Sequence, residues 1–356
     1  SPFAVAAVAL VEETTPRPEA GADPGTLAQA INRALADLLE QHPETLLFGE
    51  DVAVKGGVYG VTRGLHGRFG AARVFDTLLD ETSILGLAAG SAVSGFVRIP
   101  EIQYLAYLHN AEDQLRGEAA TLQFFSQGRF RNGMVVRVAG YGYQKGFGGH
   151  FHNDNAVGVL RDIPGLVIAS PSRPEDAAAM LRTCVAAAKV DGSVCVFLEP
   201  IALYHARDLY EEGDGHWTAP LGGPHVPVGS ARTHLDGDDL TIVSWANGLR
   251  MSLRVAMRLA ARGIYARVVD LRWLAPLPVE DVLREAAVTG RVLVVDETRR
   301  TGGVSEGVLA ALVDAGFDGA LARVASKDSF VPLGDAANLV LLSEDEMEAA
   351  ALRLCA

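Results

Sequence analysis

The sequence predicts an α/β fold made of two doubly wound domains, each with a parallel sheet between layers of helices. Short apolar runs alternate along the chain with longer segments in which apolar residues recur every three or four positions. This alternation is typical of strand–helix–strand units. The chain has 356 residues, 49% of them hydrophobic, which is enough to bury two or three separate cores. A polar stretch at 205–225, rich in Gly, Pro and charge, marks a domain boundary.

The N-terminal residues precede the first domain. The segment 1–13 begins with an apolar run that is too short to span a bilayer and lacks the basic leader of a secretory signal. The segment 14–25 is rich in Pro, Gly and Ala and predicts a linker. Ser1 is not a Met, so we keep open whether the chain is a separate subunit or a cut piece of a longer polypeptide.

The first helix and strand carry clear boundary signals. Thr26 and Gln29 predict a capping box, apolar residues then recur at helical spacing, and Pro43 ends the helix. The apolar run at 45–51 predicts a buried strand that ends in acids. Sheets of this type bind ligands at the carboxyl ends of their strands, so these acids are candidates for a functional site.

The later elements alternate in the same way. In the first domain we expect helices and strands by turns, with helices at 82–95, 110–125 and 175–188 and strands at 96–104, 134–140, 166–172 and 193–200. In the second domain we expect helices at 249–262, 279–288 and 303–315 and strands at 239–247, 265–274, 291–298 and 321–326. This order implies parallel sheets with helices on both faces.

Charge and cysteine content limit the class of protein. Lys and Arg total 31 against 44 Asp and Glu, a net charge of −13, which argues against nucleic acid or an anionic membrane as the main partner.

Cys184, Cys195 and Cys355 form no CxxC pair, and the first two lie in apolar surroundings. We therefore expect core thiols and a reducing, cytoplasmic setting.

Two acidic clusters are candidates for proton chemistry. Gly49–Glu50–Asp51 lies at a predicted strand end, and Glu81 precedes the Gly- and Ala-rich helix at 82–95, with leucines such as Leu79 beside it. A carboxyl group in apolar surroundings can share a proton with a ligand nitrogen. Taken singly, each cluster also fits a plain structural role, as solvated acids in a turn or as favourable charges at a helix N-terminus.

The loop KGFGGHFHNDN (145–155) is a third candidate. It follows a predicted strand and combines closely spaced glycines with His150, His152 and Asp154. We considered zinc, but the spacing matches no standard ligand pattern and no Cys takes part, so no metal site is predicted here.

Two glycine motifs do not support a cofactor site. Gly140-x-Gly142-x-x-x-Gly146 is not GxGxxG, and no helix pattern follows directly, which argues against an NAD-dependent dehydrogenase. Gly213–Gly215 follows no apolar strand and predicts a turn. Asn247, which follows it at a distance typical of a magnesium-binding segment, falls in the strand expected at 239–247.

Several stretches, taken together and in order, carry a family resemblance. They are LLFGEDVAVKGGVYGVTRGL (46–65), RVFDTLLDETSILGLAAGSAVSG (73–95), PEIQYLAYLHNAEDQL (100–115), FGGHFHNDN (147–155), IPGLVIASPSRPEDA (163–177), VFLEPIALY (196–204), VVDLRWLAPLPVEDV (268–282) and VDETRRTGGVSE (295–306). From about residue 26 to its end the chain resembles the beta subunits of the thiamine diphosphate-dependent decarboxylating component of 2-oxoacid dehydrogenase complexes. The resemblance implies an N-terminal extension (1–25), a pyrimidine-binding transketolase-like domain (26–204), a linker (205–227) and a transketolase C-terminal domain (228–356).

The resemblance also assigns site residues. Glu81 falls on the glutamate that bonds the aminopyrimidine ring of thiamine diphosphate, and Glu50 on a second acidic position near it. Leu79 and Tyr104 match positions that flank the pyrimidine. His152 matches the loop histidine close to the reacting carbons, where it could protonate the substrate oxygen or assist acyl transfer to lipoamide.

The implied reaction is oxidative decarboxylation of a 2-oxoacid, with transfer of the acyl group to lipoyl-lysine of an acyltransferase. The implied partner is an alpha-type subunit, or the N-terminal half of a fused chain, which would hold the diphosphate and Mg²⁺; K⁺ is a further candidate cofactor. The expected assembly is a heterotetramer. Two alternatives stay open: a transketolase-like or other thiamine diphosphate enzyme outside a complex, and a catalytically silent assembly subunit.

Some positions depart from the family pattern. Asn153 and Asp154 replace a common Ser-Gln pair after the loop histidine, and Ala106 replaces a common Asp. His109 and His150 have no usual counterpart. Because these changes touch the implied site, the choice between pyruvate and a branched-chain substrate is left open.

Overall fold

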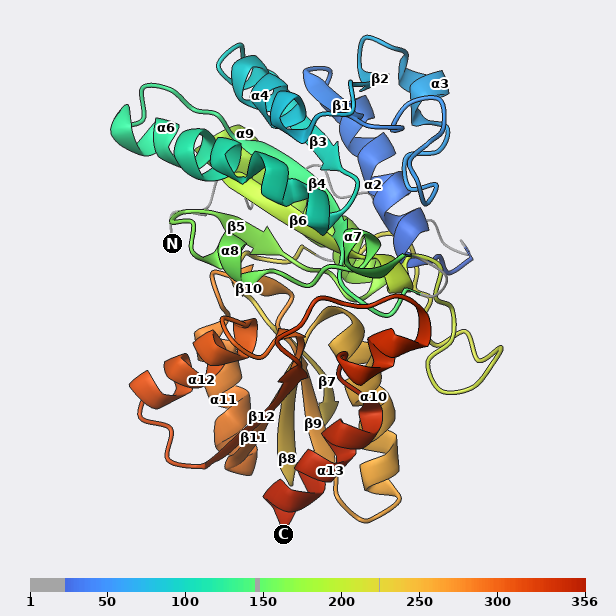
Figure 1. The fold of residues 1–356 in the computed structure, drawn as a ribbon, viewed down its shortest axis with the longest axis vertical. Coiled ribbons are helices and arrows are strands. Elements are labelled where there is room, and N and C mark those ends of the chain that lie inside the picture. The colour runs from blue at the N-terminus through green and yellow to red at the C-terminus, as the bar shows by residue number, and fades with distance from the viewer. Residues whose placement is uncertain (1–22, 145–147, 224) are drawn as a thin grey trace.

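The computed structural model describes residues 23–144, 148–223 and 225–356. Two α/β domains with mainly parallel sheets lie one above the other, as the sequence predicts (Figure 1). The first sheet has seven strands, in the spatial order β10 (Trp273–Ala275), β5 (Val167–Ala169), β6 (Val194–Pro200), β4 (Met134–Gly140), β3 (Val97–Ile102), β1 (Thr45–Gly49) and β2 (Val74–Asp76). The second sheet has five, in the order β12 (Ala320–Ser326), β11 (Arg291–Arg299), β8 (Leu240–Ser244), β9 (Ala266–Asp270) and β7 (Arg232–Asp236).

Helices cover both faces of the first sheet. Helices α2 (Leu27–Gln41) and α9 (Pro174–Asp191) pack on one face, and α4 (Glu81–Ala92) packs on the other. Successive residues of a strand point to opposite faces, so Val135 enters the first core and Val136 the second. The capping box predicted at the start of α2 is present.

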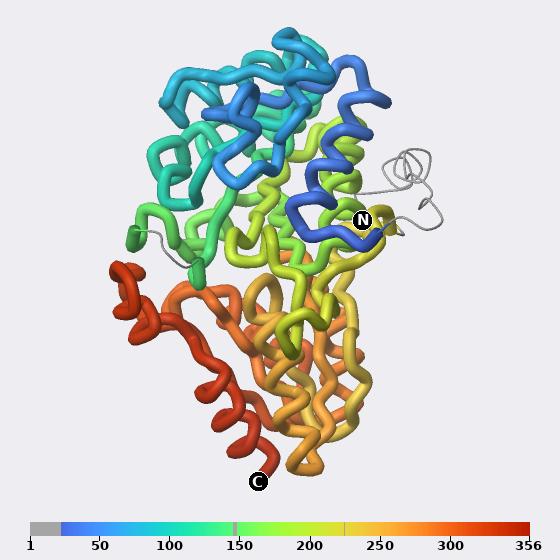
Figure 2. The backbone as a smooth tube through the Cα atoms, turned by 90° about the vertical axis from the view of Figure 1, so that its right-hand side faces the viewer, coloured from blue at the N-terminus to red at the C-terminus, as the bar shows by residue number. Residues whose placement is uncertain are grey.

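The second sheet is covered in the same way. Helices α10 (Ala246–Ala260) and α13 (Glu344–Cys355) pack on one face, and α11 (Val279–Thr289) and α12 (Val304–Asp314) on the other. Figure 2 shows the first half of the chain above the orange-to-red second half, with α13 along one edge.

One predicted strand is divided between the two sheets. The segment expected as a single strand at 265–274 ends as β9 at Asp270, and Arg272 then adopts a positive φ of 59°. Trp273–Ala275 form β10, which pairs antiparallel with β5 of the first sheet. An apolar run does not reveal that its second half crosses to another sheet, so the expectation of one strand was wrong.

The strand expected at 239–247 is shorter than predicted. It ends at Ser244, and Asn247 lies in the first turn of α10 instead of in a strand. Buried side chains bind the free backbone N–H groups of this turn: Ser172 Oγ accepts from Ala246 at 2.7 Å, and Glu297 Oε1 accepts from Asn247 at 2.9 Å. These caps come from distant parts of the chain, so the local pattern could not show them.

The helix expected at 110–125 is interrupted. The helical segment starts earlier than expected, as α5 (Leu105–Leu108). It continues through the 3₁₀ turn η1 (His109–Ala111) and the π-helical η2 (Gln114–Ala119), and it ends as α6 (Ala120–Phe125). A π turn inserts an extra residue and shifts the face that the later residues present.

The predicted loop at 145–155 contains one helical turn, α7 (Gly149–His152); Lys145, Gly146 and Phe147 lie outside the described residues. The remaining short elements are α3 (Leu65–Phe69), α8 (Gly158–Arg161), η3 (Ile201–Leu203) and η4 (Gly334–Leu339).

Gly213–Gly215 form the predicted turn, in which the Asp214 carboxylate accepts four backbone N–H bonds.

The sequence also predicts core thiols. Cys184 and Cys195 are buried free thiols, as predicted. Within the described part of the chain, no helix combines the length and the apolar character needed to cross a bilayer.

Candidate functional site

Parallel pairing gathers the predicted site residues at one edge of the first sheet. Strand β1 pairs with both β2 and β3, so the carboxyl ends of the three strands meet. Glu50 follows β1, Glu81 begins α4 after β2, and Tyr104 follows β3. The three residues are far apart in sequence, and the sheet brings them to the same edge.

The two acids lie close enough for their charges to interact. The Glu50 side chain lies at the strand end with only 9% of the residue exposed. Burial raises the pKa of Glu50, and the negative charges of Glu81 and Asp51 raise it further. Asp80 caps α4 by accepting from Ser83 N at 3.1 Å, which fixes Glu81 at the first helical position. Two carboxyl groups so placed can hold one proton between them and a ligand.

An aromatic group borders the acids. The Tyr104 and His152 rings meet edge to face with centroids 4.8 Å apart, and Tyr107 lies 5.2 Å from Tyr104 and 6.4 Å from His152. Burial raises the pKa of Tyr107, and the charges of Glu50 and Glu81 add to this. Tyr107 therefore links the acid pair to the histidine. We missed it in the sequence, although the Tyr-x-x-Tyr spacing of one helical face was a usable signal.

His152 has a defined orientation on α7. Its Nδ1 is 3.1 Å from the carbonyl oxygen of Gly148, and a carbonyl can only accept, so Nδ1 carries the hydrogen. The Tyr104 ring packs against the same imidazole. In this tautomer of the neutral ring, Nε2 carries the lone pair that can accept a proton.

Leu79 lies in the turn that leads into α4 and is 78% exposed, next to the equally open Leu78. The arrangement of acids, aromatic rings and an open apolar side chain fits a planar heterocycle with ring nitrogens, such as an aminopyrimidine.

Comparison with known proteins identifies the family. The transketolase pyrimidine-binding domain matches residues 24–205, and the transketolase C-terminal domain matches residues 229–346. "Pyruvate dehydrogenase E1 component subunit beta" of Staphylococcus epidermidis is 34% identical over 330 residues, covering 90% of this chain and 96% of that protein. The Staphylococcus aureus protein with the same name shares the same identity and coverage.

The chain belongs to the family of 2-oxoacid dehydrogenase beta subunits. It is thus a beta-type part of a thiamine diphosphate-dependent 2-oxoacid dehydrogenase, as the resemblance implied. Solved structures show the same fold: "Split gene transketolase, inactive beta4 tetramer" aligns with a TM-score of 0.73 at 18% identity, covering 93% of this chain and 99% of that one. A transketolase mutant from Pichia stipitis aligns with a TM-score of 0.65 at 12% identity, covering 97% of this chain and 48% of the longer one.

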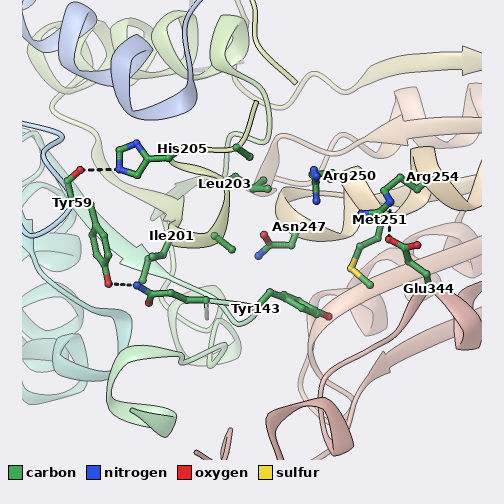
Figure 3. Close-up of a pocket in the computed structure, with 13 residues that line it drawn as sticks. Tyr59, Tyr143, Ile201, Leu203, His205, Asn247, Arg250, Met251, Arg254 and Glu344 are labelled. Atoms are coloured by element: carbon green, nitrogen blue, oxygen red, sulfur yellow. Dashed lines mark hydrogen bonds and ion pairs between the residues drawn. The ribbon is translucent and has the colours of Figure 1, made fainter. Parts of the chain in front are cut away.

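A hollow of about 680 Å³ in this beta-type chain is lined at one end by Tyr59, which packs against Tyr104 of the aromatic group (Figure 3). The Tyr59 hydroxyl donates to Tyr104 Oη at 3.1 Å and accepts from Gln144 Nε2 at 2.7 Å. Tyr59 therefore connects the lining of the hollow to the aromatic group. At its other end the hollow is lined by α10, where Arg254 pairs with Glu344. We did not predict Tyr59 or Gln144, which no sequence motif distinguishes.

The described residues include one cluster with metal-ligand chemistry, and it lies away from the acids of the beta-type site. Asp176, His234 and Asp270 bring ligand atoms within 4.8 Å of one another. However, the oxygens of Asp176 already accept from Arg232 and Arg272, each at 3.1 Å. Two guanidinium groups oppose the binding of a further cation, so this cluster is a charge network that joins the domains.

Proposed function

We propose that the chain decarboxylates a 2-oxoacid, of pyruvate or branched-chain type, and passes the acyl group to lipoyl-lysine of an acyltransferase. It would be active only with an alpha-type partner, either a separate subunit or the N-terminal half of a fused chain. The observation that carries this proposal is the acid pair, Glu50 and Glu81, whose charges act on each other and on Tyr107, which packs against Tyr104 and His152.

The acid pair and its neighbours would hold the aminopyrimidine end of thiamine diphosphate. When bound, this cofactor supplies the carbon nucleophile that the reaction needs. Glu81 would bond a ring nitrogen and share its proton, and Glu50, with its raised pKa, would accept or return that proton nearby. Leu79 and Tyr104 would flank the ring and exclude water from it.

His152 would act at the substrate end of the site. Its Nδ1 donates to the Gly148 carbonyl, so Nε2 is the atom that would take up a proton and pass it to the substrate oxygen, or assist acyl transfer. The edge of Tyr104 would hold the imidazole in place during that step.

Partner and ion assignments complete the proposal. The alpha-type partner would bind Mg²⁺ and the diphosphate of the cofactor. K⁺ would stabilise the loops of this chain. Two copies of this chain and two of the partner would form a heterotetramer. The domain limits proposed are 1–25, 26–204, 205–227 and 228–356. A cytoplasmic setting stays a prediction.

The test is Glu81→Gln in the complex co-purified with its alpha-type partner, assayed with thiamine diphosphate, Mg²⁺ and a panel of 2-oxoacids. We expect kcat to fall at least ~100-fold while assembly is kept, because the amide cannot share a proton in the same way. Glu118→Gln, an exposed acid on η2, is the matched control and should retain full activity. Unchanged turnover in Glu81→Gln would indicate an assembly subunit, and turnover of ketose donors in place of 2-oxoacids would indicate a transketolase-like enzyme.

A further inference from the structure

The Asp154 carboxylate, at a position that departs from the family pattern, is buried and bound from two sides. Only 6% of Asp154 is exposed. Its Oδ2 accepts from His109 Nε2 at 3.0 Å, and its Oδ1 accepts from Arg299 Nη2 at 3.1 Å. The backbone N–H of Asn155 also donates to Oδ1, at 2.9 Å. A charged carboxylate at this depth is stable only with such partners.

Both side-chain partners of Asp154 can carry a positive charge. The hydrogen bond that His109 donates to Asp154 raises the pKa of His109, and the charges of Asp154 and Glu112 add to this, against the opposing effects of burial and Arg299. Glu112 Oε2 lies 3.8 Å from His109 Nδ1. Asp154 therefore lies between the Arg299 guanidinium and an imidazole whose charged form it favours.

These contacts hold α7 in place. The helix is a single turn that follows Gly148, so its own hydrogen bonds cannot define its position. His109 belongs to the segment that carries Tyr104, whereas Arg299 ends β11 of the second sheet. Asp154, two residues after His152, thus ties α7 to both domains.

Aromatic contacts support α7 from the side of the second domain. The Phe330 ring lies 5.1 Å from the ring of His150, and the Arg299 guanidinium lies 5.6 Å from the centre of Phe330. Arg299 therefore contacts both Asp154 and the Phe330 ring that packs against His150 of α7. The departures at His109, His150 and Asp154 form one connected structure.

We propose that Asp154 is a positioning residue for His152. Held by His109 and Arg299, it would keep α7 in the orientation that turns the His152 imidazole toward Tyr104 and the acid pair. The proposal rests on the proposed function, in which His152 acts on the substrate. Without the Asp154 carboxylate, α7 would lose the bonds that tie it to His109 in one domain and to Arg299 in the other.

The first test needs no cofactor and no turnover. In the isolated chain labelled with ¹⁵N-histidine, the His152 signals are assigned with His152→Gln. We expect Asp154→Asn to shift these signals toward a mixture of tautomers, because the ring is no longer fixed against Gly148 and Tyr104. Asp328→Asn is the matched control: its carboxylate is exposed in the same region and bonds Thr301. His152 signals that are the same in Asp154→Asn and in the control would overturn the proposal.

The second test measures activity per assembled complex. We expect Asp154→Asn to lower kcat about 10- to 100-fold, as displacement of a catalytic group does. The apparent affinity for thiamine diphosphate should change less than ~2-fold, because the acid pair is untouched. A merely structural role would reduce the amount of folded complex and leave kcat per complex unchanged, which would also overturn the proposal.

Variants at Arg299 keep the proposal testable if Asp154→Asn does not fold. The Arg299 side chain is 25% exposed, so Arg299→Leu is better tolerated, and Arg299→Lys should restore part of kcat and of the His152 signals. Equal signals and kcat in Arg299→Leu and the wild type would overturn the proposal. A wild-type complex without turnover of any 2-oxoacid would refute the proposed function instead, and the ¹⁵N signals would still decide the role of Asp154.

Discussion

Arg137, a charged residue at the centre of the first sheet, is balanced by acids from both neighbouring strands. It lies in β4 and is 1% exposed. Its Nε and Nη2 donate to the two oxygens of Glu199 in β6 at 2.7 and 2.9 Å, and Nη1 bonds Glu101 in β3. Burial raises the pKa of Glu101, and the Arg137 charge counteracts this. Each charge is therefore stable only because the others are present.

Removal of Arg137 should consequently be costly. We expect Arg137→Leu to lower the free energy of unfolding by about 3–5 kcal/mol, since it leaves Glu101 and Glu199 buried without a counter-charge. Urea denaturation of the isolated chain measures this. Arg68→Leu breaks the exposed pair with Glu40 and should cost less than about 1 kcal/mol. Equal losses in the two variants would show that the buried network does not stabilise the fold.

At the scale of elements, β4 and α9 pack without space for a side chain between them. Gly133 precedes β4, and a Cβ added there would lie 2.0 Å from the backbone oxygen of Ala188 in α9. A backbone oxygen of a buried helix cannot move aside cheaply.

We therefore expect Gly133→Ala to cost about 1–3 kcal/mol of unfolding free energy, because the helix must shift from the sheet. Gly67→Ala in α3 is the matched control: a Cβ there meets nothing within 4 Å, and the change should be neutral or stabilise by up to about 1 kcal/mol. Chemical denaturation of both variants tests the difference. A neutral Gly133→Ala would mean that α9 has more freedom than this packing implies.

At the scale of the whole molecule, charged groups join the two domains. Asp270 ends β9, and Arg272 connects it to the first domain by bonding Asp176 of α9 at 3.1 Å. Burial, and next the charge of Asp176, raises the pKa of Asp270 to about 7. The folded chain therefore keeps a proton on Asp270 at pH values where the unfolded chain has lost it.

This difference predicts how stability depends on pH. Where the folded state binds more protons than the unfolded state, stability falls as pH rises, so the Asp270 contribution is present below about pH 4 and lost by about pH 7. Asp270→Asn should remove this part of the slope, on the order of 1–4 kcal/mol over the window. Urea denaturation across the range measures it, with the exposed Asp335→Asn as control. A slope that persists in Asp270→Asn would contradict the assignment.

The sequence by itself determined the local features and the family. Helical spacing, the Thr26–Gln29 capping box and the strand–helix alternation predict the two α/β domains, since such patterns depend on neighbouring residues alone. The positions of Glu50, Glu81, Tyr104 and His152 followed from motif order, and the parallel sheet then brought them to one edge.

Only the tertiary structure decided which distant groups meet. Asp154 binds His109 and Arg299, 45 and 145 positions away, and Trp273 leaves its own sheet to extend the other. The spacing of apolar residues along the sequence predicts which face of a helix or strand is buried. It does not predict which other element covers that face. That choice is made by the packing of the whole chain, where buried charges must find partners and strands must find an edge.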